Sequence, residues 1–265
     1  MKFGGRIAAV AATAVVVYGW WVRPRLMRWG ATDEEVAGPY PGAELVPDGE
    51  RGPTMAVTID APPEQVWPWL VQMGGDRGGW YSWDHLDNAG HPSAQRVHPE
   101  WQDLARGDYL RYWTRRHGPV DAWEVAALEP NRFLGLHGLS DLRLRNLDPE
   151  PPRPPAYTEG LWGFLLNELP GGRTRLVIGG YEAIRPRWLG RVYSFFPVVW
   201  VMQARMLAVS SGISNEQPMR GRKWPLLRTP LSARRIARSS RANSGYDRHA
   251  AQVVDSRATA QTAVE

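Results

Sequence analysis

"GLWGFLLNELPGGRTRLVIGGYE", residues 160–182, consists of two apolar runs on either side of a Pro-Gly-Gly turn. Each run has the length of a β-strand, and a short connection rich in proline and glycine is typical of a β-hairpin. The stretch therefore predicts adjacent antiparallel strands at residues 160–169 and 173–182. It places an antiparallel sheet at the centre of the fold.

Four further segments upstream have the pattern of strands bounded by turns. In residues 54–61 the side chains of Met55, Val57 and Ile59 fall on one face, as in a half-buried strand. The proline-rich "LDPEPPRPPAY" that precedes the hairpin predicts an extended loop. The remaining strand candidates are residues 108–114, 120–129 and 132–138.

Two helices are predicted around this sheet. In residues 62–74, "PPEQVWPWLVQMG", the first prolines pre-set a helical turn, Pro68 introduces a kink and Gly74 ends the helix. Residues 191–212 have helical spacing, and from Val192 to Met202 they are apolar nearly all round apart from Ser194. This helix is therefore either deeply buried or faces something other than water. The order predicts an α+β fold in which a curved antiparallel sheet wraps a long C-terminal helix and leaves a cavity beside it.

The excess of positive over negative charge lies at the two ends of the chain. The 265 residues carry a net charge of +5, yet residues 29–217 are acidic, with a net charge of −7, and residues 218–265 have a net charge of +7. A nucleic-acid-binding domain should be basic where it folds, so nucleic acid is not an expected partner. Because the chain has no cysteine, disulfides and thiolate metal sites are excluded.

The N-terminal segment has the composition of a membrane anchor. "IAAVAATAVVVYGWWV", residues 7–22, is uncharged and is flanked by basic residues on both sides. Tryptophans at the interface would bring the run to the length that a single membrane span needs. The segment predicts an anchor over residues 1–28 at the cell membrane. A cleaved signal peptide and a buried helix are the alternatives.

The C-terminal segment, residues 218–265, is rich in arginine, serine and alanine and has no sustained apolar period. This composition predicts a disordered tail. The alternative is a basic segment that contacts an anionic membrane surface, which would favour a cytoplasmic position for the domain formed by residues 29–217.

"QMGGDRGGWYSWDHLDN", residues 72–88, combines glycines, aromatic rings and polar groups. The glycines allow the chain to turn sharply after the helix, which would place Trp80, Tyr81 and Trp83 at one end of the cavity. Tyr81, Asp84 and His85 are the candidates for acid–base catalysis, although a role in holding the loop is the expectation for Asp84.

Metal and phosphate chemistry have no support in this loop. The spacing of His85, Asp87, His91 and His98 matches no metal-ligand signature, and no lysine follows the glycines at the offset of a phosphate-binding loop. We therefore expect neither a metal nor a cofactor.

Several motifs together resemble a known superfamily. "TIDAPPEQVWPWLVQMG", "DRGGWYSWDHLDN", "PEWQDLARGDYL" and "VMQARMLAVSSGI" are similar to those of the START-related helix-grip proteins, also called SRPBCC or polyketide cyclase/dehydrase and lipid-transport-like proteins. The resemblance covers residues 29–212 and is strongest over residues 56–108. It implies a hydrophobic pocket for sterols, lipids, polyketides or similar molecules, and it implies no universal catalytic motif.

These observations predict a membrane-tethered domain that binds or carries a hydrophobic small molecule or lipid between sheet and helix. An enzyme of cyclase, dehydratase or hydrolase type acting in the same cavity is the alternative, and a module that binds a partner through its basic tail is a third possibility. The prediction requires that the cavity is not filled by side chains. The residues expected to contact the ligand are Trp80, Tyr81, Trp83, Tyr112, Trp123, Trp162, Phe196 and Trp200.

Overall fold

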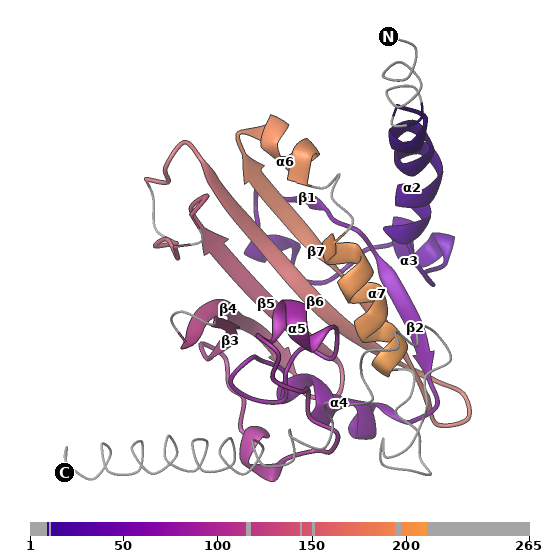
Figure 1. The fold of residues 1–265 in the computed structure, drawn as a ribbon. Helices are drawn as coiled ribbons and strands as arrows, with labels where there is room; N and C mark the ends of the chain where they lie inside the picture. The colour runs from indigo at the N-terminus through magenta and orange to yellow at the C-terminus, as the bar shows by residue number, and fades with distance from the viewer. Residues whose placement is uncertain are drawn as a thin grey trace, which may run out of the picture. The chain divides into compact units, whose positions relative to one another are not determined.

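The computed structural model describes residues 10, 12–114, 118–143, 145–149, 152–193 and 198–210 (Figure 1). The predicted tail, residues 218–265, lies outside these residues, as do residues 1–9 and 11 of the predicted anchor. Within the described part of the chain, no helix combines the length and the apolar character that crossing a membrane requires. The predicted spanning helix is therefore not supported.

The fold is mixed α+β and is built on one antiparallel sheet of seven strands. The strands are ordered β1-β7-β6-β5-β4-β3, and β2 also pairs with β7. The strands are β1 (Glu50–Arg51), β2 (Met55–Ile59), β3 (Tyr109–Thr114), β4 (Gly118–Glu129), β5 (Phe133–Ser140), β6 (Tyr157–Leu169) and β7 (Arg173–Arg185). All six predicted strands are confirmed, whereas the short β1 has no counterpart among the sequence predictions.

The hairpin of β6 and β7 is the longest pairing in the sheet. Its register runs without interruption from Leu169 opposite Arg173, beside the Pro-Gly-Gly turn, to Tyr157 opposite Arg185. Both strands are longer than the apolar runs that predict them. The extension continues the pairing beyond Gly160, where the sequence pattern becomes polar.

Helices and short turns complete the fold. The residues predicted as one C-terminal helix contain two helices, and residues 194–197 between them lie outside the described part. The predicted helix after β2 is confirmed as α4, with Pro68 inside it. The helical elements are η1 (Tyr18–Val22), α2 (Arg23–Leu26), α3 (Asp33–Ala37), η2 (Ala43–Leu45), α4 (Pro63–Val71), α5 (Asp84–Asp87), η3 (Pro99–Trp101), α6 (Arg187–Tyr193) and α7 (Val198–Ser210).

The sheet buries side chains on both of its faces. On one face, Met206 and Leu207 of α7 join α4 and the inward side chains of the strands in the main core, and α7 lies over the β7–β2 side of the sheet (Figure 1). On the other face, Tyr40 packs over Gly163 and donates a hydrogen bond of 3.1 Å to the Val177 carbonyl. The face that α7 covers also contains the cavity described below.

Candidate ligand-binding cavity

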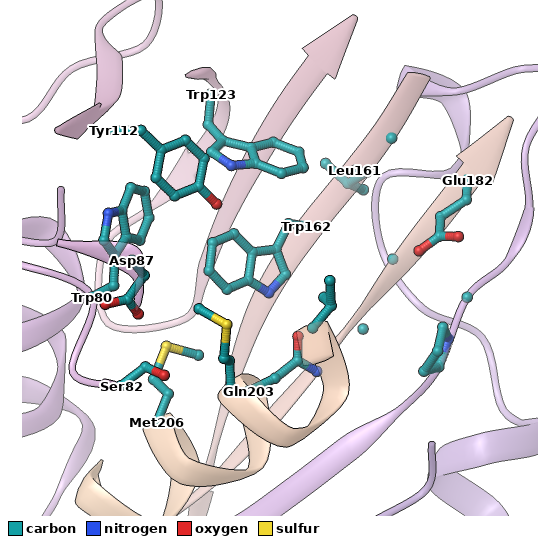
Figure 2. A pocket seen from close by; sticks show the side chains of 17 residues that line it. Trp80, Ser82, Asp87, Tyr112, Trp123, Leu161, Trp162, Glu182, Gln203 and Met206 are labelled. Carbon is teal, nitrogen blue, oxygen red and sulfur yellow. The ribbon is translucent and has the colours of Figure 1, made fainter. Parts of the chain in front are cut away.

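A cavity of about 200 Å³ lies between α7 and the strands that face it (Figure 2). It separates the Met202–Met206 side of α7 from β6 and β7, and the loop before α5 closes one end. Its wall is formed by Trp80, Tyr112, Trp123, Leu161, Trp162, Val199, Met202 and Met206, by the polar side chains of Ser82, Asp87, Glu182 and Gln203, and by Gly52, Pro53, Gly160, Gly179 and Gly180.

Aromatic rings form a continuous part of this wall. The ring centroids of Trp80 and Trp162 are 5.8 Å apart at an interplanar angle of 26°, and those of Trp123 and Trp162 are 5.7 Å apart. Tyr112 lies 4.8 Å from Trp80. Side chains alternate along a strand, so Gly160 of β6 faces the cavity as Trp162 does. The wall thus draws on β3, β4 and β6 as well as the loop.

Two tryptophans of the wall keep an unsatisfied polar group. The indole Nε1 atoms of Trp80 and Trp162 are buried and have no hydrogen-bond partner among the described residues. A buried donor without an acceptor is unfavourable by about 1–3 kcal/mol. The wall is therefore apolar in area but retains donors that a small structural adjustment could offer to a ligand.

The glycine-rich loop after α4 is held in place by its own hydrogen bonds. Gly74 and Gly79 exchange bonds of 3.2 and 2.8 Å, and a Cβ on Gly75 would stand 2.6 Å from the Trp113 backbone nitrogen. Gln72 Nε2 donates a hydrogen bond of 2.7 Å to Tyr81 Oη. This fixed turn directs Trp80 into the cavity and Tyr81 towards α4.

The three residues considered for catalysis do not line the cavity. Tyr81 is bound to Gln72, and burial raises the pKa of its hydroxyl. Asp84 accepts bonds from the backbone nitrogen and the hydroxyl of Ser93, at 3.1 and 2.7 Å, and so it holds the loop as expected. His85 is exposed. None of the three is placed to reach a molecule in the cavity.

Asp87 is the acidic group that does reach the cavity. It ends α5, is 8% exposed, and its Oδ1 has no hydrogen-bond partner among the described residues. Burial and then the nearby Asp84 carboxylate raise the pKa of Asp87 to about 6, while Ser82 and Arg205 act in the opposite direction. In the sequence, Asp87 stands out only through the histidine and aspartate spacing that was tested for a metal site. The one available signal was its position three residues after Asp84 in the same helical turn.

Two further ionisable groups line the wall. Burial raises the pKa of the Glu182 carboxyl, which lies at the opposite end of the cavity from Asp87 (Figure 2). Burial also raises the pKa of the Tyr112 hydroxyl. Tyr112 as a whole residue is 37% exposed, and it lines the cavity.

The predicted ligand contacts divide into three groups. Trp80, Tyr112, Trp123 and Trp162 stand on the cavity wall. Tyr81 and Trp83 do not: the Trp83 ring lies under the Arg205 guanidinium at 5.2 Å. Phe196 and the side chain of Trp200 lie outside the described part of the chain.

The fold and site together define an α+β protein with an aromatic-walled internal cavity. Within the described residues, no group of three or more His, Asp or Glu side chains is arranged to hold a metal ion. The chain matches no protein-family model and no curated protein.

Remote likenesses to solved structures exist. The chain is similar to protein Ms6760 from Mycobacterium smegmatis, with 13% identity over 62% of this chain and 90% of that one and a TM-score of 0.35. The chain is also similar to the Polyketide_cyc-like protein Cgl2372 from Corynebacterium glutamicum, with 16% identity over 60% of this chain and 88% of that one and a TM-score of 0.29. A third similar structure is DynU16 of the dynemicin biosynthetic locus, with 14% identity over 63% of this chain and 49% of that one and a TM-score of 0.31. At these TM-scores the likenesses carry no conclusion about function.

Proposed function

We propose that this protein binds a small, largely apolar molecule without covalent change in the cavity beside α7. The observation that carries the proposal is an unfilled space of about 200 Å³ in the main core, walled by four aromatic side chains and two methionines. Burial of apolar area would supply the affinity, and the few polar groups of the wall would orient the molecule.

The volume of the cavity limits the size of its occupant. An apolar cavity of about 150 Å³ accommodates benzene, whereas pockets for drug-sized ligands span about 300–1,000 Å³. A space of about 200 Å³ therefore suits a molecule with one or two rings. Of the two expected cargoes, this favours a small molecule over a whole lipid.

A cavity-filling variant tests the proposal. Gly160 lines the cavity, and a Cβ added there would meet only the Tyr181 carbonyl, at an ordinary contact distance of 3.5 Å. Gly160→Leu should therefore fold and occupy the space. Asn167→Leu adds the same side chain at the exposed end of β6 and is the matched control.

The full chain and both variants would be screened by thermal shift and native mass spectrometry against a panel of one-ring and two-ring compounds. We expect bound compounds and a raised melting temperature for the full chain and for Asn167→Leu, and neither for Gly160→Leu. The proposal fails if no compound binds, or if Gly160→Leu binds them as well as the full chain does.

A second candidate function is proton transfer to or from the bound molecule, and Asp87 favours it. A general acid or base works best with a pKa near the working pH, and burial raises the pKa of Asp87 to about 6. Such a shift also occurs at structural carboxyls. If compounds recovered from the protein are unchanged after prolonged incubation, binding alone remains; a product that Asp87→Asn no longer forms would establish catalysis.

We also propose that the N-terminal helical segment contacts a membrane surface. Trp20 and Trp21 are 86% and 61% exposed, and the Arg25 guanidinium stacks over the Trp21 ring at 4.3 Å. Aromatic rings beside arginines suit the boundary between lipid headgroups and acyl chains. Replacing both tryptophans by serine should reduce flotation with anionic vesicles. Trp188→Ser, at a 64% exposed tryptophan on α6, should not; equal flotation of all variants would refute the contact.

A further inference from the structure

We propose that the cavity selects an organic cation, a small amine with one or two rings, whose ammonium group pairs with the Asp87 carboxylate. The inference rests on the proposed binding function and narrows its ligand class. It contrasts with the expectation for a fatty acid or another anionic amphiphile, which would need a basic group in the cavity.

The charges on the cavity wall are of one sign. Among the described residues, the cavity lining includes the acids Asp87 and Glu182 but no lysine, arginine or histidine. Arg205, whose charge acts on Asp87, does not line the cavity: its Nε donates a hydrogen bond of 3.0 Å to the Ser82 carbonyl, and its guanidinium stacks over Trp83. An anion in the cavity would be desolvated beside two carboxyls without a counter-charge.

Arg51 is also directed away from the cavity. It stands opposite Tyr181 in the register of β1 and β7, and its guanidinium lies 4.2 Å from the centre of the Tyr40 ring. Tyr181 and Glu182 are consecutive in β7 and so point to opposite faces of the sheet. Arg51 therefore lies on the face away from Glu182 and gives the cavity no positive group.

One end of the cavity combines a carboxyl with aromatic rings. Figure 2 shows Asp87 near Trp80 and Tyr112, whose ring centroids are 4.8 Å apart. A cation is attracted to the face of a tryptophan or tyrosine ring, most strongly where water is excluded. An ammonium group at this end would gain both an ion pair and ring contacts, and its apolar body would extend towards Trp162.

One carboxylate oxygen of Asp87 is free to accept a hydrogen bond from a ligand. Its Oδ1 is buried without a hydrogen bond from the described residues. The charged and titratable groups that face it are Asp84 of its own helix, Arg205 of α7 and the Tyr112 hydroxyl of β3. An ammonium group in the cavity would donate to this free oxygen and add a positive charge to that of Arg205.

The ionisation of Asp87 gives a second readout. Burial raises the pKa of Asp87 to about 6, so the carboxyl is mostly ionised at pH 7.5 and mostly protonated at pH 5.0. Because an ammonium pairs with the ionised form alone, its affinity should fall about tenfold between these two pH values. A neutral analogue should bind equally at both.

The experiment compares three probes that share one apolar body: 2-(1-naphthyl)ethylamine, 2-(1-naphthyl)ethanol and 1-naphthylacetate. Calorimetry with the full chain at pH 7.5 should show the amine binding about tenfold more tightly than the alcohol, and the acetate binding most weakly. Asp87→Asn should bring the amine to the affinity of the alcohol and leave the alcohol within about threefold. Glu182→Gln, and Asp48→Asn at an exposed position outside the cavity, should retain the preference for the amine.

Each outcome decides between the claims. An amine that binds no more tightly than the alcohol, or a preference that survives Asp87→Asn, overturns the cation inference and leaves the binding function intact. Loss of the preference in Glu182→Gln instead overturns the assignment to Asp87. If none of the probes and no panel compound binds, the proposed function itself fails.

Discussion

We expect Asp87→Asn to stabilise the protein at neutral pH and to lose most of that benefit in mild acid. Burial raises the pKa of Asp87 from its usual 3.8 to about 6. The folded state therefore binds a proton that the unfolded state releases over this interval, and the native protein loses stability as the pH rises through it. Asparagine has nearly the same shape and cannot ionise, so it removes the penalty.

The size of the effect follows from the shift. At 1.36 kcal/mol for each pKa unit, the ionised Asp87 destabilises the fold by about 3 kcal/mol at pH 7.5. At pH 4.5 the same linkage gives a destabilisation of about 1 kcal/mol, because Asp87 is mostly ionised in the unfolded chain and mostly protonated in the folded one. Solvent that enters the cavity screens the charge, so these values are upper bounds. The difference between the two pH values should be at most about 2 kcal/mol.

Urea denaturation of the full chain and of Asp87→Asn at pH 7.5 and pH 4.5 measures this difference directly. Asp48→Asn, which removes an exposed carboxylate, should change the free energy of unfolding by less than about 0.5 kcal/mol at either pH. If Asp87→Asn destabilises the protein at pH 7.5, or stabilises it more at pH 4.5 than at pH 7.5, then Asp87 is not an unpaired buried carboxylate and the reasoning is refuted.

Two other substitutions test the packing that shapes the cavity. Gly180→Ala would place a Cβ 1.7 Å from the Leu161 carbonyl at a φ of +154°, and should lower the free energy of unfolding by about 3 kcal/mol or more in urea; Gly171→Ala, where φ is +85° and nothing lies within 4 Å, should lower it by about 1 kcal/mol. Glu35→Gln weakens two hydrogen bonds from Arg175, of 2.7 and 2.8 Å, and should lower the free energy of unfolding by about 2 kcal/mol at pH 7. Because Arg175 holds the pKa of Glu35 below its usual 4.5, this difference should vanish as the pH falls below that value, and a constant difference would contradict the ion pair.

The sheet could be predicted from sequence because its signals are local. A turn between two apolar runs identifies the hairpin of β6 and β7, and alternation identifies β2. The aromatic wall followed in part, since Trp123 and Trp162 belong to strands whose inward faces the pattern indicates. Trp80 was found through its loop.

The polar part of the site could not be predicted, because it depends on contacts between distant residues. Asp84 and Asp87 lie in one helical turn, and the two bonds from Ser93 hold Asp84 in the loop while Asp87 faces the cavity. Trp80 and Trp83 are similarly close in sequence, and Arg205, far along the chain, covers Trp83. Local periodicity contains no information about such partners.

The side chain of Gln72 has a consequence for how molecules exchange. This fully buried amide donates to Tyr81 and to the Arg96 carbonyl and accepts from the His98 nitrogen, at 2.7, 3.1 and 3.0 Å. Moving the loop away from α4 would break these three hydrogen bonds of a buried amide together, so we expect this side of the cavity to stay closed. We then expect molecules to enter and leave beside Val199 of α7, a cavity-lining residue that is 41% exposed.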